Sequence, residues 1–284
     1  MGRAISGRAL LAGVAGWPIA HSRSPMLHTY WLERYSIDGL YVPLAIAPAH
    51  LGAALHMLPV LGFRGLNVTI PHKEAAFAAM DQCDEVARRL GAVNTIVVDR
   101  DGRLCGSNSD GFGFIENLRT GLPGWDAPRR PVAVLGAGGA AVAVVDALLR
   151  CGVPEVRLTN RTAERASALA QRLGGPIVVA PWSDRSRLLA DVSLLVNTTS
   201  LGMEGQAPLT MALDALPPAA AVCDLVYAPL ETDLLRQARR HGYPTVDGLG
   251  MLLHQARPGF AAWFGREPAV DDDLRRHVLA GLAA

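Results

Sequence analysis

A glycine-rich turn near the middle of the chain constrains the fold more than any other feature of the sequence. The apolar run Val132–Leu135 predicts a buried strand, which leads into the motif Gly136-x-Gly138-x-x-Ala141 and then an apolar helix. In this context the first glycine permits a tight turn, the second lets backbone approach a pyrophosphate, and the small residue lets helix pack on strand. The motif therefore predicts a dinucleotide-binding parallel sheet. A glycine-rich turn without a ligand is the alternative.

The residues after the next predicted strand, Val156–Thr159, indicate which dinucleotide binds. Folds that bind NAD usually place an acidic residue here, where it accepts hydrogen bonds from the ribose 2′-hydroxyl. This chain has Asn160 and Arg161 instead, with Arg165 one turn further on. A guanidinium can bind a 2′-phosphate bidentately. The pattern favours NADP over NAD, although each arginine alone is equally typical of an ordinary surface charge.

Strand-like and helix-like segments alternate along nearly the whole chain, which predicts two α/β domains with parallel sheets. The strands expected before the glycine-rich turn are Leu10–Gly16, Tyr41–Ile46, Gly65–Ile70, Ala92–Val98 and Leu104–Gly106. Asp101-Gly102 predicts a tight turn that pairs the last of these back as an edge strand. Lys73–Leu90 reads as one helix that ends at Gly91.

The segment Gly121–Pro131, rich in glycine and proline, separates this first series from a second one. The second series is expected to contain the strands Pro131–Leu135, Val156–Thr159, Ile177–Val179, Leu194–Asn197 and Ala221–Leu225. The stretch Met251–Ala284 reads as helical, with Asp271–Asp273 favouring the start of the last helix.

Charge and cysteine content exclude several classes of protein. The 284 residues include 27 basic and 26 acidic side chains, a balance that predicts no nucleic-acid footprint. The four cysteines form no CxxC pair and are typical of reduced core thiols in a cytoplasmic protein. No run approaches the roughly 18 apolar residues that span a membrane. Arg3 and Arg8 before an apolar stretch resemble a weak signal peptide, and MGRAIS fits a myristoylation pattern, but a first strand explains these residues better.

The segment Asn67–Lys73, NVTIPHK, places a lysine just past the end of a predicted strand, where α/β proteins keep their chemistry. Ser22 and Ser24 flank Arg23 in a strand-to-helix loop, where two hydroxyls could reach one anion. Ser24 is alternatively a helix N-cap before Pro25.

Polar residues also interrupt the apolar strand AVNTIVV, and Asn94 there needs either a ligand or backbone partners. Asp110 is either an N-cap or the acid–base partner of Lys73. No histidine pair has the spacing of a metal site and no serine lies in a GxSxG elbow, so no metal centre is predicted.

Taken in order, HSRSP, NVTIPHK, GAVNT, NSDG, GAGGAA, NRTAER, NTTSLGM, VYAPLET and DGLGMLLHQ resemble the shikimate dehydrogenase family over almost the whole chain. The resemblance implies NADPH-dependent reduction of 3-dehydroshikimate to shikimate, on the route to chorismate and the aromatic amino acids. It implies a small-molecule substrate, no nucleic-acid or membrane partner, and a monomer or a homodimer.

The resemblance also implies roles for individual residues. Lys73 and Asp110 would be the catalytic pair. The substrate carboxylate would be held by Ser22, Ser24 and Tyr227, and its hydroxyls by Asn67, Thr69, Asn94, Asp110 and Gln255. The phosphates and ribose of NADP would be held by Gly136, Ala137, Gly138, Gly139, Ala140, Asn160, Arg161, Thr162 and Arg165. Leu225 and Gly248 would lie nearer the nicotinamide, and Glu85 occupies a further position that contacts cofactor in some members.

The family fold implies that residues 1–112 and 248–284 form the substrate-binding, catalytic domain. Residues 113–247 would form a Rossmann NADP-binding domain inserted into it, with the substrate in the cleft between the two. NSDG stands where NTDG is commoner, and Val142 stands where arginine is frequent.

Burial of Lys73 would lower its pKa and Asp110 would raise it, and the sequence leaves the outcome open. It also leaves open activity on quinate or an aminated analogue. A nucleotide-binding regulator without turnover remains a further alternative.

Overall fold

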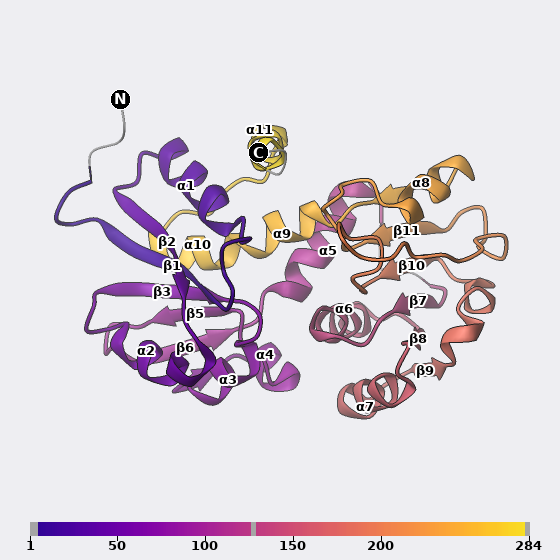
Figure 1. The fold of residues 1–284 in the computed structure, drawn as a ribbon, viewed down its shortest axis with the longest axis horizontal. Helices are drawn as coiled ribbons and strands as arrows, with labels where there is room; N and C mark the ends of the chain where they lie inside the picture. Colours follow the sequence, from indigo (N-terminus) through magenta and orange to yellow (C-terminus); the bar gives the residue numbers. More distant parts are fainter. Residues whose placement is uncertain (1–4, 126–128, 282–284) are drawn as a thin grey trace. The chain divides into compact units, whose positions relative to one another are not determined.

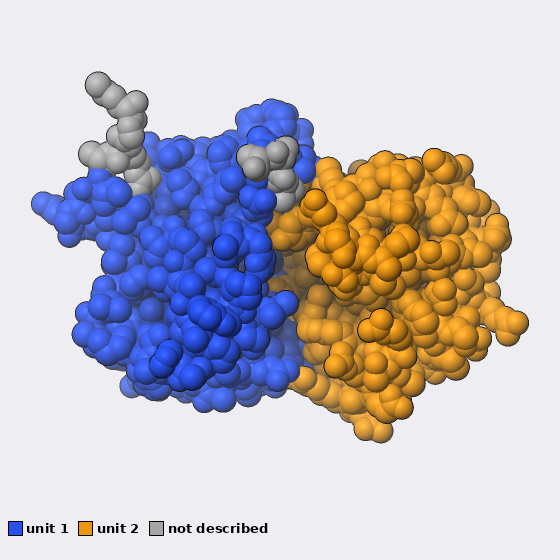
Figure 2. All heavy atoms as spheres, viewed as in Figure 1, with its two compact units in different colours: residues 1–109, 255–284 blue, residues 110–254 orange. Residues whose placement is uncertain are grey.

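The computed structural model describes residues 5–125 and 129–281, which fall into two compact units (Figure 1 and Figure 2). Among these residues, unit 1 contains 5–109 and 255–281, and unit 2 contains 110–125 and 129–254. Arg3, the start of the MGRAIS pattern, residues 126–128 of the Gly/Pro-rich segment and residues 282–284 lie outside the described residues. Each unit is built on a six-stranded sheet with helices, which confirms the predicted α/β fold class.

The sheet of unit 1 has the strand order β2-β1-β3-β5-β6-β4. Its strands are β1 (Leu10–Gly16), β2 (Gly39–Ala45), β3 (Phe63–Val68), β4 (Gln82–Cys83), β5 (Thr95–Val98) and β6 (Leu104–Ser107). β1 pairs in parallel with β2 and β3, whereas β5 runs antiparallel to β3 and β6. The sheet is therefore mixed, and the predicted hairpin at Asp101-Gly102 is confirmed as the connection from β5 to β6.

Helices cover both faces of this sheet (Figure 1). On one face lie α1 (Ser24–Arg34) and α10 (Arg257–Phe264), where the rings of Trp31 and Phe260 meet with centroids 5.2 Å apart. The other face carries α2 (Leu51–Met57), α3 (Lys73–Ala78) and α4 (Glu85–Leu90), over buried residues that include Leu66 and Val68. Because α10 comes from the C-terminal part of the chain, residues 255–281 complete the core that residues 5–109 begin.

The prediction of a single helix over Lys73–Leu90 is wrong. The chain forms α3, then the short strand β4, then α4. Asp84 starts the second helix, because its carboxylate accepts a hydrogen bond from the Ala87 amide at 2.6 Å. Since β4 pairs in parallel with β6, the strand β6 lies inside the sheet and is not the predicted edge.

The sheet of unit 2 is wholly parallel and has the order β12-β11-β10-β7-β8-β9. Its strands are β7 (Val132–Leu135), β8 (Val156–Thr159), β9 (Ile177–Ala180), β10 (Leu194–Asn197), β11 (Ala221–Asp224) and β12 (Thr245–Val246). The predicted strands of this series are confirmed to within a residue or two, and β12 was not predicted. Figure 1 shows α6 (Gly139–Arg150) and α7 (Ala163–Leu173) on one side of the sheet and α8 (Asp233–Arg240) on the other.

The junctions between the units lie at 109/110 and 254/255, so α5 (Asp110–Gly121) and nearly all of α9 (Leu249–Gln255) belong to unit 2. The sequence instead puts the junctions at 112/113 and 247/248. Asn117 of α5 explains the difference, because its amide donates to the Asp247 carbonyl at 2.7 Å and lies against Gly250 of α9.

The C-terminal stretch is helical but interrupted. α9 and α10 are followed by α11 (Asp272–Ala280). α10 ends at Gly265, whose φ of +70° suits glycine. The carboxylate of Asp271 accepts the Leu274 amide at 3.0 Å, so the predicted acidic start of the last helix is confirmed. No helix in the described part of the chain is long and apolar enough to cross a membrane.

Gly65 of β3 has no room for a side chain, and its φ of +152° also disfavours one. An added Cβ would lie 1.9 Å from the Ile96 carbonyl oxygen and 2.3 Å from Trp263 Nε1, which hydrogen-bond each other at 2.9 Å. We expect Gly65→Ala to lower the free energy of unfolding by about 3 kcal/mol or more, measured by denaturant titration. Gly52→Ala in α2, where a Cβ meets nothing within 4 Å, should raise it by about 0.5–1 kcal/mol. Equal effects of the two substitutions would contradict this account.

Candidate active site

A connected chain of buried polar side chains runs through unit 1. The Tyr41 hydroxyl donates to Asn67 Oδ1 at 2.7 Å, and Asn67 Nδ2 donates to Thr95 Oγ1 at 3.2 Å. Thr95 Oγ1 in turn donates to Asn94 Oδ1 at 3.0 Å. All four side chains are almost fully buried. Because a buried polar group left unpaired is costly, each member depends on its neighbours.

The chain continues from Asn94 through Ser109 to Gln255. The Ser109 amide donates to Asn94 Oδ1 at 2.9 Å, and Asn94 Nδ2 donates to Ser109 Oγ at 3.1 Å. Ser109 Oγ then donates to the Gln255 carbonyl oxygen at 2.8 Å. We call the series Tyr41, Asn67, Thr95, Asn94, Ser109 and Gln255 the polar chain. It joins three of the predicted substrate ligands, Asn67, Asn94 and Gln255, whereas Tyr41, Thr95 and Ser109 are not among the predicted ligands.

Asn94 therefore has backbone and side-chain partners inside unit 1. This agrees with the alternative to a ligand, namely that backbone groups satisfy the Asn94 amide. Asp110 follows Ser109 directly, so the polar chain also holds the backbone immediately before the predicted acid. Asp110 is buried at the first position of α5, which belongs to unit 2.

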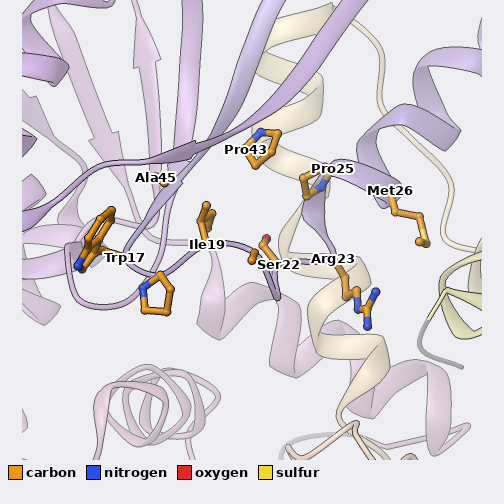
Figure 3. Close-up of a pocket in the computed structure, with 10 residues that line it drawn as sticks. Trp17, Ile19, Ser22, Arg23, Pro25, Met26, Pro43 and Ala45 are labelled. Carbon is orange, nitrogen blue, oxygen red and sulfur yellow. The ribbon is translucent and has the colours of Figure 1, made fainter. Parts of the chain in front are cut away.

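Ser22 and Ser24 lie where β1 leads into α1. The N-cap of α1 is Arg23, so the interpretation of Ser24 as the N-cap is wrong, and Ser24 is the first helical residue. The Ser24 amide donates to Ser22 Oγ at 3.4 Å. Ser22 and Arg23 line a pocket of about 670 Å³ whose other walls are mostly apolar, with Trp17 and Ile19 among them (Figure 3).

Arg23 is not among the predicted residues, although its place between the two serines is readable in the sequence. It is half-buried, and no carboxylate of the described residues lies within ion-pair distance of it. Ser22 and Arg23 thus bring a hydroxyl-bearing and a guanidinium-bearing residue to the lining of the pocket, although their polar groups point in different directions (Figure 3).

Lys73 is held by backbone contacts just beyond β3. The strand ends at Val68, before Pro71 and two residues short of the predicted end at Ile70. The Lys73 carbonyl accepts the Val93 amide at 2.9 Å, which ties α3 to the residue before Asn94. His72 is buried, and its Nε2 donates to the Ile46 carbonyl oxygen at 2.8 Å. Thr69, a further predicted ligand, is half-buried and its amide donates to the Ala15 carbonyl at 2.9 Å. Lys73 is half-buried, and it is the only lysine in the sequence.

The glycine-rich turn of unit 2 has the shape that its motif predicts. Gly136 has a φ of +108°, and a Cβ there would lie 2.6 Å from Thr198 Oγ1. Gly138 and Gly139 are exposed, and a Cβ at either would meet nothing within 4 Å. Ala137 and Ala140 are half-buried in the same turn. The turn opens α6, whose first amides can face a phosphate.

Asn160 fastens the loop after β8 to the glycine-rich turn. Its Oδ1 accepts the Ala137 amide at 3.2 Å, and its Nδ2 donates to the Thr162 carbonyl at 2.8 Å. Arg161 and Arg165 are exposed and make no ion pair within the described residues. An open glycine turn beside two exposed guanidinium groups fits a dinucleotide that carries a 2′-phosphate.

A second buried network shapes the loops after β10 and β11. Asp224 accepts hydrogen bonds from Asn197 Nδ2 at 2.9 Å, the Val226 amide at 3.0 Å and Thr232 Oγ1 at 2.7 Å. Burial raises the pKa of Asp224, and these hydrogen bonds oppose the shift. The sequence patterns do not single out this carboxylate.

The loop after β11 carries Leu225 and Tyr227. A Cβ on Gly248 would lie 2.0 Å from the Leu225 carbonyl oxygen, so glycine is needed for these two predicted nicotinamide residues to meet. Tyr227 is half-buried in unit 2, whereas the other two predicted carboxylate ligands lie in unit 1. Glu85 is exposed at the first position of α4 in unit 1.

His28 of α1 lies against the polar chain. Its ring stacks on that of Tyr41 with centroids 3.8 Å apart and an angle of 3° between the planes. Burial lowers the pKa of His28 from 6.5 to about 3, and the nearby Asn67 side chain only partly opposes this. Neither ring nitrogen has a hydrogen bond of regular geometry. His28 is therefore a neutral aromatic side chain in the folded protein.

Unit 2 combines a glycine turn, a pair of exposed arginines and a parallel sheet. Unit 1 is a separate α/β unit that carries a lysine and the polar chain. Together these features are typical of two-domain nucleotide-dependent oxidoreductases. No cluster of three or more His, Cys, Asp or Glu side chains that could hold a metal exists in the described residues.

Comparison with known proteins identifies the family. Residues 14–96 match the model of the shikimate dehydrogenase substrate binding domain, and residues 124–203 match that of shikimate / quinate 5-dehydrogenase. The chain is 58% identical to shikimate dehydrogenase (NADP(+)) of Paramagnetospirillum magneticum over 97% of its length and 100% of that protein. The chain belongs to the shikimate dehydrogenase family.

Solved structures agree with this assignment. Shikimate 5-dehydrogenase of Thermus thermophilus, in complex with NADP(H) and shikimate, superposes with a TM-score of 0.83 at 37% identity, covering 96% of this chain and 99% of that one. Quinate dehydrogenase of Corynebacterium glutamicum, in complex with NAD, gives a TM-score of 0.87 at 32% identity, covering 97% and 99%.

The neutral state of His28 predicts a loss of stability in acid. In the unfolded chain the imidazole of His28 takes up a proton near pH 6.5, whereas in the folded protein the same imidazole does so only near pH 3. Since the unfolded state binds more protons between these values, the free energy of unfolding should fall as the pH drops, by up to about 1.4 kcal/mol per pH unit. Denaturant titrations across the acidic range should show a flatter dependence for His28→Phe. The same substitution at the exposed His50 should leave the slope unchanged, and an unchanged slope in His28→Phe would contradict the prediction.

Proposed function

We propose that this chain catalyses the reversible, NADPH-dependent reduction of 3-dehydroshikimate to shikimate, on the route to chorismate and the aromatic amino acids. Near-complete alignment at 58% identity to a shikimate dehydrogenase (NADP(+)) carries this proposal. A lysine beside a buried polar chain in one unit, and an open glycine turn in the other, support it. A nucleotide-binding regulator without turnover would need neither Lys73 nor the polar chain of unit 1.

NADP is the proposed cofactor, and unit 2 is the proposed NADP-binding domain. The glycine turn (Gly136–Ala140) and the start of α6 would hold the pyrophosphate, and Asn160, Arg161, Thr162 and Arg165 would hold the ribose and its 2′-phosphate. Leu225 and Gly248 would border the nicotinamide, with Glu85 as a further contact. When bound, NADPH supplies the hydride that reduces the substrate carbonyl. Val142, in the first turn of α6, brings no charge to this site.

Unit 1 is the proposed substrate domain. Ser22 and Ser24, with Tyr227 from unit 2, are the proposed ligands of the substrate carboxylate, and the guanidinium of Arg23 adds a positive charge beside Ser22. The proposed ligands of the substrate hydroxyls are Asn67, Thr69, Asn94, Asp110 and Gln255. Since several of these belong to the polar chain, their positions are set before a substrate arrives, which limits the entropy lost on binding.

Lys73 and Asp110 are the proposed catalytic residues. As the carbonyl is reduced, negative charge develops on its oxygen, and a lysine ammonium can stabilise that charge and donate a proton from Nζ. Arginine could supply the charge but not the proton, because its pKa lies above about 12. The sequence contains 27 basic residues, and Lys73 alone among them is lysine. This distribution supports a proton-transfer role for Lys73.

A cytoplasmic location is also proposed, and the four cysteines support it, since all are free thiols in the structure. Sedimentation would decide between the proposed monomer and homodimer.

The first test of the function is reduction of NADP by the purified protein with shikimate, followed by nicotinamide absorbance. The same assay with quinate tests the second family model, whose description also names quinate. We expect turnover confined to shikimate and NADP. Comparable turnover with quinate would place the enzyme in the broader-specificity branch, and no turnover with any pair would contradict the proposal.

Lys73→Arg and Lys73→Met separate charge from proton transfer at this position. Both should lower kcat by roughly 100-fold or more, because neither side chain can donate a proton near neutral pH. The arginine variant should keep its KM for shikimate closer to that of the unaltered protein. Steady-state kinetics checks this, and near-normal kcat in Lys73→Arg would contradict proton donation by Lys73.

Arg161→Ala tests recognition of the 2′-phosphate. Loss of a charge-assisted hydrogen bond of about 1.5–3 kcal/mol should lower kcat/KM for NADP by about 10- to 100-fold and leave that for NAD nearly unchanged. Arg172→Ala, an exposed arginine in the last turn of α7, the helix that begins just after Arg161, is the matched control and should change neither. Equal losses with both cofactors would show that Arg161 does not contact the 2′-phosphate.

A further inference from the structure

Tyr41 lies at the buried end of the polar chain and has no role in the function proposed above. It is 4% exposed, and its ring is stacked on His28. The Tyr41 hydroxyl donates to Asn67 Oδ1 at 2.7 Å, and the Ser24 side chain lies near enough to oppose part of the rise in the pKa of the phenol. One phenol therefore binds Asn67 of β3 and lies near Ser24 of α1, two proposed substrate ligands from different elements.

The register of the sheet explains how Tyr41 reaches Asn67. Tyr41 of β2 pairs with Ala12 of β1, and Asn67 of β3 pairs with Val14 of β1. Residues two apart on a strand share a face, so Tyr41, Ala12, Val14 and Asn67 all face the side covered by α1 and α10. The small side chain of Ala12 lets the Tyr41 ring extend across β1 to β3.

The hydrogen bonds of the Asn67 side chain leave only one lone pair of its amide oxygen for a ligand. A side-chain amide has two N–H donors and one oxygen with two lone pairs. Asn67 Nδ2 donates to the Asn94 carbonyl at 3.1 Å and to Thr95 Oγ1 at 3.2 Å, so both donors are used within unit 1. Tyr41 occupies one lone pair of Oδ1. The remaining lone pair can only accept a hydrogen bond.

We propose that Tyr41 is a positioning residue that fixes the Asn67 amide with its oxygen as acceptor, so that the site selects a substrate with a proton-donating hydroxyl at that position. This inference rests on the proposed function, because Asn67 is one of its substrate ligands. Burial supports it by raising the pKa of Tyr41 well above its usual range, which keeps the phenol protonated and able to donate. The neutral ring of His28 packs on Tyr41 and restricts its rotation.

Tyr41→Phe tests the proposal with shikimate and two fluoro analogues, each carrying fluorine in place of one ring hydroxyl that does not react. Fluorine accepts hydrogen bonds but cannot donate one. In the unaltered protein, fluorine at the position that meets Asn67 should lower kcat/KM by about 10- to 100-fold. In Tyr41→Phe that discrimination should shrink at least several-fold, and discrimination at the other position should stay the same. KM for shikimate should rise while kcat changes little, because Tyr41 touches neither the cofactor nor the reacting carbon.

Tyr243→Phe is the matched control. Tyr243 also loses a phenol hydrogen bond on substitution, to the Leu216 carbonyl at 2.8 Å, but it packs against the apolar core of unit 2. It should lower the melting temperature without changing either discrimination ratio. A folded Tyr41→Phe protein with unchanged ratios would overturn the positioning role alone.

The unaltered protein supplies two further outcomes. If it does not oxidise shikimate with NADP, the proposed function and the positioning role both fail. If it uses both fluoro analogues as well as shikimate, Asn67 does not act as an acceptor and the positioning role fails while the function stands. This second result needs no variant, so the proposal stays open to refutation even where Tyr41→Phe does not fold.

Discussion

The requirement that buried polar side chains be paired organises unit 1. Asn67, Thr95 and Asn94 are 6%, 1% and 2% exposed, so none of them can rely on bulk water for its hydrogen bonds. The polar chain satisfies them with one another and with backbone, and it ties β2, β3, β5 and the residues before α5 and α10 into one network. Because each partner lacks an alternative, a change at one member should alter the others, and substitutions along the chain should not be additive. The proposed substrate ligands are therefore positioned as a set.

In unit 2, buried polar groups are paired around a single carboxylate, that of Asp224, and not through a series of neutral side chains. Asp224 joins the ends of β10 and β11 and the N-cap Thr232 of α8 through one carboxylate. Burial raises its pKa, which shows that the arrangement costs free energy while the group is ionised. In return, the loops that carry Thr198 and Leu225 start from fixed points. Gly136 lies against Thr198 and Gly248 lies against Leu225, so each of these glycines packs on a residue next to a member of the Asp224 network.

Local sequence patterns predict most of this architecture and part of the site. Strands such as Val156–Thr159 and Leu194–Asn197 are confirmed at both ends. The first, VRLT, alternates apolar and polar residues, and the second, LLVN, is an apolar run that stops at a polar residue. The helix expected over Lys73–Leu90 fails, since helical propensity gives no sign of the pairing between β4 and β6. The role of Tyr41 is not predicted either, because contacts between residues distant in sequence leave no local pattern. Its partner Asn67 is distant in sequence, and only the register across β1 brings the two together.

The uneven use of arginine and lysine links the site to its proposed chemistry. Arginine suits the proposed phosphate contacts at Arg161 and Arg165, because a guanidinium carries a fixed charge and binds oxygen pairs bidentately. Lysine can release its proton, and the sequence contains a lysine only at position 73. The backbone there is tied to Val93, next to Asn94, so the backbone that carries the proposed proton donor is anchored beside a member of the polar chain. In the proposed function, the hydroxyl ligands and the proton donor would then lie in one part of unit 1, an arrangement that favours alignment of the substrate at its reacting carbon.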